Sequence, residues 1–444
     1  MAPADDLADE PLTLQGVRDA WVAYDEDDRV AAFRGLPRPD AEDLFLELPA
    51  KDQATLVGAL PPPERRSWVR LLAPDDAADL VQQVPPTERA AWIALLDETT
   101  QKDVAGLLAF AEDDAGGLMH PRYVRLRPDL SVDEAISYLR RASRDRVGTS
   151  YYAYVLDADS VLLGVVSVRE LFASSPEKRV RDVMRTDVVK ADETMDQEAL
   201  ATLFRTHDLV AVPVVDASGR MKGVVTFDDI GDVLVEEATE DIQKIGGTEA
   251  LDAPYLRTPL WQMVRKRAGW LAALFVGELF TASAMSRFED EIRAATVLSL
   301  FIPLIISSGG NSGSQATTLV IRAMALGEVT LRDWWRVVKR ELASGLALGA
   351  ILAPIGVLRI FLWQRLHLAD YTEHYMLVAA TVGIAVVGVV TWGTLAGSML
   401  PFVLRRMRLD PASASAPFVA TLVDVSGLVI YFEVAAAILT GTLL

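Results

Sequence analysis

Long apolar stretches dominate the carboxyl-terminal part of the chain. Residues 294–321 and 375–404 contain no charged side chain, and each is longer than the roughly 20 residues that a helix needs to cross a bilayer. Three further apolar stretches, residues 268–286, 342–363 and 417–444, contain few ionisable side chains. This pattern predicts five membrane-spanning helices.

Basic residues gather on alternate connections between these helices. Lys and Arg are frequent before the first helix, between the second and third, and between the fourth and fifth, and they are scarce on the opposite connections. By the positive-inside bias, the amino-terminal part lies in the cytoplasm and the carboxyl terminus lies outside. The first 30 residues are acidic and lack an apolar core, so we expect no signal peptide.

A shorter period marks the amino-terminal part. A Leu or Val recurs every twelve residues, and Pro directly follows several of these positions. Pro suits the first turn of a helix, and the acids after it suit helix amino termini, so each unit is expected to form one short helix and a turn in a solenoid-like stack. The positions are Leu36, Leu48, Leu60, Leu72, Val84 and Leu96, with Pro37, Pro49, Pro61 and Pro85 after them.

Two similar strand and helix units follow this repeat. They run from Met119 to Leu171 and from Met184 to Leu234. Near its end, each unit has the sequence Gly-Val-Val followed by Ser or Thr, then two further residues and an acidic residue. The β-α-β-β-α order and this ending resemble CBS domains. Tandem CBS domains bind adenosine nucleotides in many relatives, which makes ATP a possible ligand, and a purely structural dimerisation module is the alternative.

The expected fold class is a multidomain α and α/β membrane protein. It combines an α-helical repeat N domain, tandem CBS domains, a connecting helix and a transmembrane domain of five helices. The expected boundaries are an acidic amino-terminal segment (1–29), the N domain (30–118), the first CBS domain (119–182), the second CBS domain (183–241), the connecting helix (242–264) and the transmembrane domain (265–444).

Composition narrows the possible functions. Asp and Glu total 62 against 43 Lys and Arg, and the formal net charge of -19 argues against a nucleic-acid binder. Cysteine is absent, which excludes disulfides, thiolate metal sites and cysteine nucleophiles, and only four His residues remain. The acidic excess lies before residue 263, where it is either a solvated surface or a binding surface for divalent cations.

One acidic stripe is expected at the end of the second CBS unit. Residues three or four positions apart share a helix face, and like charges at this spacing destabilise a helix unless something neutralises them. Solvent and salt could screen these charges, or a bound cation could compensate them, in which case oxygen ligands favour Mg²⁺ or Ca²⁺. The stripe contains Asp229, Asp232, Glu236, Glu237, Glu240 and Asp241.

Polar groups inside the predicted spans are candidates for an ion path. Asp424 lies near the middle of the last span, where an ionisable side chain is costly and indicates function. The small-residue segment Ser307 to Gln315, with Gly309, Gly310 and Asn311, either unwinds to present carbonyl groups to a pore or allows close helix packing. Glu278 and Glu433 are secondary candidates for the same path.

Several motifs, in this order along the chain, resemble the MgtE family of magnesium channels over nearly the whole sequence from about residue 30. They are EDDAGGLM from Glu112, EEATEDI from Glu236, IISSGGNSGSQATTLVIRA, LRDWWRVVKRE from Leu331, LDPASASAP from Leu409 and PFVATLVDVSG. The resemblance implies a homodimer, formed through the CBS and transmembrane domains, that imports Mg²⁺ through a pore between the subunits. Some relatives have Asn where this chain has Ala416.

The resemblance also implies the roles of individual residues. Asp424 would hold hydrated Mg²⁺ in the pore, with Gly309, Gly310, Asn311 and Gly427 beside it. Cytosolic Mg²⁺ would bind the N domain, the CBS domains and the connecting helix and close the pore. The acids carried over for this role are Asp43, Asp75, Asp79, Asp196, Glu198, Asp208, Asp229, Asp232, Glu237, Glu240, Asp241 and Asp410.

Other functions fit parts of the pattern. One is a CBS-gated transporter of another divalent cation such as Co²⁺ or Mn²⁺, and another is a non-conducting sensor of nucleotide or Mg²⁺. A membrane enzyme is not expected, because the spans hold no His and no pair of catalytic aspartates. The expected location is the plasma membrane, with several crossings.

Overall fold

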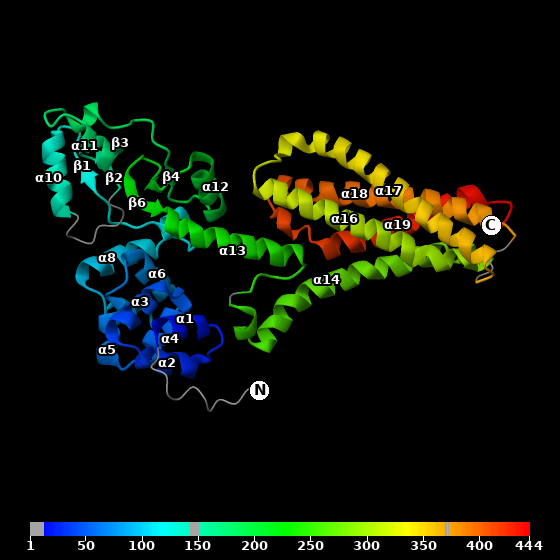
Figure 1. Ribbon diagram of the computed structural model, residues 1–444, viewed down its shortest axis with the longest axis horizontal. Coiled ribbons are helices and arrows are strands. Elements are labelled where there is room, and N and C mark those ends of the chain that lie inside the picture. The colour runs from blue at the N-terminus through cyan, green and yellow to red at the C-terminus, as the bar shows by residue number, and fades with distance from the viewer. Residues whose placement is uncertain (1–12, 143–150, 252, 369–370, 372) are drawn as a thin grey trace. The chain divides into compact units, whose positions relative to one another are not determined.

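The computed structural model describes residues 13–142, 151–251, 253–368, 371 and 373–444 (Figure 1). The chain divides into two compact units, Met1–Leu234 and Val235–Leu444.

Short helices build the start of the first unit. They are α1 (Leu14–Ala20), α2 (Glu26–Gly35), α3 (Arg38–Glu47), α4 (Ala50–Ala59), α5 (Pro62–Val69), α6 (Pro74–Gln82), α7 (Arg89–Ile93) and α8 (Glu98–Leu107). The repeat positions from Leu36 to Leu96 are all buried, and Pro37, Pro49 and Pro61 lie at the amino-terminal caps of α3, α4 and α5. The predicted stack of short helices is therefore confirmed, with each repeat Leu or Val anchoring the turn between two helices.

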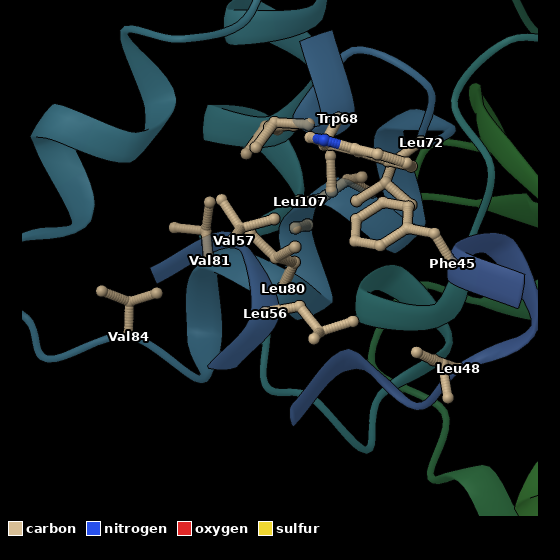
Figure 2. Packing of buried hydrophobic residues seen from close by; sticks show 14 of the residues in the cluster. Phe45, Leu48, Leu56, Val57, Trp68, Leu72, Leu80, Val81, Val84 and Leu107 are labelled. Atoms are coloured by element: carbon tan, nitrogen blue, oxygen red, sulfur yellow. The ribbon is translucent and has the colours of Figure 1, made fainter. Parts of the chain in front are cut away.

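Aromatic rings fill the interior of this helical stack (Figure 2). The ring centroids of Phe45 and Trp68 are 5.3 Å apart, and Leu72, Leu80 and Leu107 pack in the same cluster. Burial of such large apolar side chains contributes about 1.5–3 kcal/mol each relative to exposure. The core comes from helices that follow one another along the chain, which is why the twelve-residue period is visible in the sequence.

The CBS pair forms the rest of the first unit. Its first copy contains β1 (Arg125–Leu126), α10 (Val132–Ala142), β2 (Tyr152–Leu156), β3 (Leu162–Ser167) and α11 (Val168–Ala173), and its second copy contains β4 (Ala191–Asp192), α12 (Gln197–His207), β5 (Ala211–Val215), β6 (Met221–Thr226) and α13 (Phe227–Ile245). Before β1 lies α9 (Ala115–Leu118), and η1 (Val180–Asp182) is a 3-10 turn. In each sheet the middle strand pairs parallel with the first strand and antiparallel with the third. The predicted tandem β-α-β-β-α units are confirmed.

The two CBS copies are joined by reciprocal contacts at equivalent glycines. A Cβ atom on Gly223 would lie 2.6 Å from Cγ of Met119, and a Cβ atom on Gly164 would lie 2.9 Å from Sδ of Met184. Each methionine precedes a backbone bridge to the same strand, from His120 to β6 and from Arg185 to β3. The aligned glycines of the two copies are therefore needed for this packing.

The second unit is a helical bundle. After the end of α13 it contains η2 (Tyr255–Arg257), α14 (Leu260–Arg287), α15 (Glu289–Ala294), η3 (Thr296–Phe301), α16 (Ile302–Ala325), η4 (Leu331–Asp333), α17 (Trp334–Arg365), α18 (Tyr375–Arg406), η5 (Pro411–Ser413) and α19 (Ala416–Leu439). Among the described residues, five helical segments are long and apolar enough to cross a membrane, as predicted. The central helix is α18, which packs against α16, α17 and α19.

The connecting helix differs from its expected bounds of 242–264. Helix α13 ends at Ile245, because Gly246 and Gly247 follow and Gly247 takes a left-handed conformation with a φ of 73°. The Thr248 amide closes this end by donating to the Gln243 carbonyl at 3.1 Å. Helix α14 then begins only at Leu260, after Pro259 at its amino-terminal cap.

Candidate ion path and cation-sensing sites

Asp424 lies where three helices of the second unit meet. It is half-buried on α19, and a Cβ atom on Gly310 of α16 would lie 3.9 Å from its Oδ1 atom. Glu278 of α14 is within electrostatic reach of the same carboxylate, and Gly277 beside it packs against Thr421 of α19. The glycine at position 310 therefore keeps the α16 backbone close to this carboxylate.

The small-residue segment of α16 packs against neighbouring helices. Of the two alternatives predicted for this segment, the structure contradicts the unwound stretch, because residues 302–325 form one continuous helix. A Cβ atom on Gly393 of α18 would collide with the Gly309 carbonyl oxygen, and one on Gly313 would lie 2.9 Å from the Gly393 carbonyl oxygen. The carbonyl groups of this segment stay within a regular helix, so close packing is the reason for these small residues.

The other residues expected at the pore lie in different surroundings. Gly309 and Gly427 both pack against Val389 of α18, with Cβ positions 2.5 and 2.9 Å from a methyl carbon of that residue. Asn311 is exposed, and its amide donates to the Ser307 hydroxyl at 3.4 Å. Glu433 is also exposed. Of the small residues of α16 in this set, Gly310 is the glycine whose Cβ position approaches the Asp424 carboxylate.

An acidic cluster forms inside the first unit, and we call it the α6 cluster. Its members are Asp75 and Asp76 from the first turn of α6, Asp79 one turn later on α6, and Asp228 and Asp229 from the first turn of α13. The Thr226 hydroxyl holds Asp229 by donating to its Oδ2 atom at 2.7 Å, and the Thr226 amide donates to the same atom at 3.1 Å. Both helices direct their amino termini toward these carboxylates, where helix dipoles favour negative charge.

Burial and mutual repulsion perturb the α6 cluster. Burial, followed by the charge of Asp229, raises the pKa of Asp75 to about 7, and burial together with Asp76 and Asp75 raises the pKa of Asp79 to about 7. Burial also raises the pKa of Asp229 to about 6, although its hydrogen bonds from Thr226 act in the opposite direction. Near neutral pH, ionisation of several of these carboxylates together therefore costs the folded unit free energy.

The surroundings of the α6 cluster provide little positive charge. Nε2 of His120 lies 3.9 Å from Oδ1 of Asp75, but burial lowers the pKa of His120 and favours its neutral form. No Lys or Arg forms an ion pair with the cluster in the described part of the chain. Oδ1 of Asp75 is buried and has no hydrogen-bond partner among the described residues.

The α6 cluster is a candidate site for a hydrated divalent cation. Its carboxylate oxygens are the ligands that Mg²⁺ prefers, and the unpartnered Asp75 oxygen is available to one. Within the described ranges, however, no three His, Cys, Asp or Glu side chains are close enough to bind a metal directly. Mg²⁺ keeps several of its waters in proteins, so contact through water fits this wider spacing.

A second acidic cluster lies inside the second unit, and we call it the Asp410 cluster. It contains Glu237, Glu240 and Asp241 near the end of α13 and Asp410 before α19, with Lys244 among them. Burial, followed by the charges of Asp410 and Glu237, raises the pKa of Asp241 to about 6. Lys244 pairs with Glu240 and with Asp410, where Nζ lies 2.6 Å from Oδ2. This cluster contains a cation of its own.

The remaining acids expected as metal ligands are all exposed at their positions in the fold. Asp196 caps α12 by accepting from the Glu198 amide at 3.0 Å, and Asp208 ends the same helix in a left-handed conformation with a φ of 49°. These two therefore have a local structural role. The exposed acids are Asp43, Asp196, Glu198, Asp208 and Asp232.

Sequence reasoning missed three participants. Asp76 is adjacent to Asp75, and Asp228 is adjacent to Asp229, so each could have been included as part of a double acid. Lys244 follows Glu240 by four residues, a spacing that predicts an ion pair on one helix face. Its second partner, Asp410, is too far away in sequence for any local pattern to indicate it.

Comparison with known families and proteins covers most of the chain. Residues 302–434 match the family model MgtE, described as a divalent cation transporter, residues 14–113 match the MgtE intracellular N domain, and residues 115–177 and 180–236 match the CBS domain. The chain is 40% identical to the magnesium transporter MgtE of Thermus thermophilus over 343 residues, which cover 77% of this chain and 74% of the relative. It is 32% identical to the magnesium transporter MgtE of Bacillus subtilis, over 76% of this chain and 72% of the relative.

A solved structure similar to this chain is the cytosolic domain of the Mg²⁺ channel MgtE in complex with ATP. It is 37% identical, with a TM-score of 0.46, and the match covers 50% of this chain and 90% of that one.

Proposed function

The chain belongs to the MgtE family of divalent cation transporters, and on that premise we propose that it is a Mg²⁺ channel whose cytosolic part senses Mg²⁺ and closes the pore. It is a transporter and not an enzyme. The proposal covers the ion, the direction of transport, the closure by cytosolic Mg²⁺ and the residues that carry each step.

The observation that carries the transport proposal is the position of Asp424. A half-buried carboxylate in the middle of an apolar span costs free energy, and such a residue is retained where it contacts an ion or a proton path. Gly310 lies beside it, and Glu278 adds a second acidic group to its surroundings. In a homodimer with the pore between the subunits, two copies of Asp424 would together hold a hydrated Mg²⁺ ion.

The α6 cluster supports feedback by cytosolic Mg²⁺. Its carboxylates repel one another when no cation is present, and a bound divalent cation would remove that repulsion and draw α6 toward the start of α13. Because Mg²⁺ would bind the compact arrangement more tightly than the separated one, it would shift the population toward the compact, closed state. Low cytosolic Mg²⁺ would leave the channel free to open.

The distribution of basic residues supports the orientation. Lys and Arg gather in the first turns of α14, in the first turns of α17 and at the end of α18. These helix ends and the first unit would therefore lie in the cytoplasm, with the carboxyl terminus outside the plasma membrane. ATP at the tandem CBS domains remains a prediction from the sequence, and equilibrium binding of labelled ATP to the full chain would test it.

Flux into proteoliposomes tests the transport proposal. Purified protein should admit Mg²⁺, and flux should fall when millimolar Mg²⁺ is present on the cytoplasmic face. Asp424→Ala should lower flux by roughly tenfold or more, because the ion loses its carboxylate ligand in the apolar span. Asp290→Asn, which neutralises an exposed acid on α15 outside the predicted spans, is the control and should conduct like the original protein.

Three results would contradict this assignment. Full flux through Asp424→Ala would remove Asp424 from the path. Flux of Co²⁺ or Mn²⁺ without flux of Mg²⁺ would change the transported ion. Absence of flux from a folded, reconstituted protein at every Mg²⁺ concentration would favour a sensor that does not conduct.

A further inference from the structure

Lys244 connects two parts of the second unit that are far apart in the sequence. Its Nζ atom lies 2.6 Å from Oδ2 of Asp410 and also pairs with Glu240 one turn earlier on α13. The other oxygen of Asp410, Oδ1, accepts a hydrogen bond from the Ala412 amide at 2.8 Å. Both oxygens of Asp410 are therefore engaged, one by the turn before α19 and the other by Lys244.

Several contacts surround this ion pair and dock the end of α13 on the bundle. Ile245 packs against the cluster formed by Ile321, Ala412 and Ala414. A Cβ atom on Gly247 would lie 2.7 Å from Nε1 of Trp270, so the backbone approaches that ring closely. The indole of Trp270 in turn donates to the Ser415 hydroxyl at 3.1 Å.

The docked segment leads directly into the helix that carries Asp424. Ser415 caps α19 by accepting from the Phe418 amide at 3.3 Å, and α19 then continues without interruption past Asp424. A displacement of residues 410–415 would therefore displace the start of this helix. Through this turn, a movement of the end of α13 would be transmitted to α19.

The charge balance of the Asp410 cluster shows why a lysine matters here. Glu237, Glu240, Asp241 and Asp410 are acidic, and Lys244 lies among them. It donates to Oδ2 of Asp410 at 2.6 Å and pairs with Glu240. Lys244 therefore neutralises part of the cluster with no metal bound.

We propose that Lys244 is a built-in cation that holds the end of α13 on the turn before α19 when Mg²⁺ is low, and that Mg²⁺ must compete with it for Glu240 and Asp410. The lysine sets a basal level of docking, and it lowers the affinity of the cluster for Mg²⁺ by occupying two of its carboxylates. The docking part stands on the contacts above, whereas its effect on conduction rests on the proposed function.

A local role for Lys244 makes a different prediction. A lysine in the last turn of a helix stabilises that helix through the dipole and through a pair with a Glu four residues earlier. In that case its contribution would be independent of Asp410. If Lys244 acts through Asp410, the effects of changing the two residues will not add, because each substitution removes the same interaction.

A single thiol can measure docking without any transport. The chain has no cysteine, so Ile245→Cys introduces a unique reactive group at the docked end of α13 in the full-length protein. The rate of maleimide labelling in Mg²⁺-free buffer should rise roughly five- to tenfold with Lys244→Gln, because loss of one partner leaves half-buried carboxylates unpaired. Lys244→Arg keeps the charge and should label near the reference rate.

The matched control is Lys222→Gln. It removes the same charge from an exposed lysine, whose Nζ lies 3.5 Å from Oδ2 of Asp216, and it should leave the labelling rate unchanged. Adding Asp410→Asn to Lys244→Gln should raise the rate by less than the two single effects combined. Saturating Mg²⁺ should slow labelling of Lys244→Gln, since the freed carboxylates bind the ion.

Unchanged labelling in Lys244→Gln would overturn the proposal, and so would fully additive effects with Asp410→Asn. A second reporter, Leu404→Cys, views the same interface from α18 and checks that the first thiol did not itself loosen the contact. In flux measurements, Lys244→Gln should be inhibited by Mg²⁺ with a lower midpoint. Altered labelling in a protein that shows no flux would refute the proposed function and leave the docking role of Lys244 standing.

Discussion

The α6 cluster and the Asp410 cluster gather acidic side chains in two different ways. In the α6 cluster, Asp75 has a buried carboxylate oxygen with no hydrogen-bond partner among the described residues, and the basic group that approaches it is a His whose pKa burial has lowered. In the Asp410 cluster, Lys244 bonds to two of the acids. The first cluster lacks a fixed positive charge, and the second contains one.

This difference assigns different roles to similar groups of residues. A cluster without its own cation depends on the concentration of an external one, so it can report that concentration. A cluster with a lysine is held together at every Mg²⁺ concentration, and an external cation changes its strength by a smaller amount. We therefore expect the α6 cluster to dominate the response to Mg²⁺ and the Asp410 cluster to set the resting state.

The largest expected effect is the pH dependence of the metal-free α6 cluster. A carboxyl group whose pKa is higher in the folded than in the unfolded state stabilises the fold below its unfolded pKa, and this contribution is lost as the pH rises through the folded pKa. For Asp75 and Asp79 this window runs from about 3.8 to about 7. Local stability of α6 should therefore fall by on the order of a few kcal/mol between pH 4 and pH 8.

Hydrogen exchange of the α6 amides, corrected for the pH dependence of intrinsic exchange, measures this change. The double variant Asp75→Asn and Asp79→Asn should show a smaller change, because the two groups with the most strongly raised pKa are gone while Asp229 still titrates. An equal loss of protection in that variant would mean that other groups cause the pH dependence.

The next effect is the stabilisation of the first unit by Mg²⁺. At pH 8, Mg²⁺ at about 100 times its dissociation constant should increase the protection of α6 by about 3 kcal/mol. Asp75→Asn with Asp79→Asn should abolish this gain, whereas Asp187→Asn, which neutralises an exposed acid elsewhere in the unit, should preserve it. A full Mg²⁺ response in the double variant would place the sensor outside this cluster.

The smallest expected effect comes from a substitution that gives the α6 cluster a lysine, as in the Asp410 cluster. Asp76→Lys adds a positive charge beside Asp75 and Asp79, which should raise the metal-free protection of α6 by about 1 kcal/mol through partly buried ion pairs. The same substitution should weaken the response to Mg²⁺. Stronger protection with an undiminished Mg²⁺ response would show that an internal cation does not compete with the external one.

Local sequence patterns determined the elements of this protein. The apolar stretches predicted five candidate spans, the twelve-residue period predicted the helical stack, and the duplicated Gly-Val-Val segment predicted the CBS pair. Each of these patterns reflects interactions between residues that are close in the chain, or the transfer of one whole segment into an apolar phase. The assignments of individual acids to Mg²⁺ sites, the pore role of Asp424 and the homodimer stay predictions.

Tertiary structure alone decided which polar residues meet. Asp75 reaches Asp229, and Lys244 reaches Asp410, across intervals with no sequence period that would relate them. The small-residue segment of α16 was open to two interpretations until the close approach of Gly309 and Gly393 decided for packing. Local periodicity specifies backbone conformation and the buried face, whereas contacts between distant residues depend on how complete elements pack and on which charges remain compensated when they do.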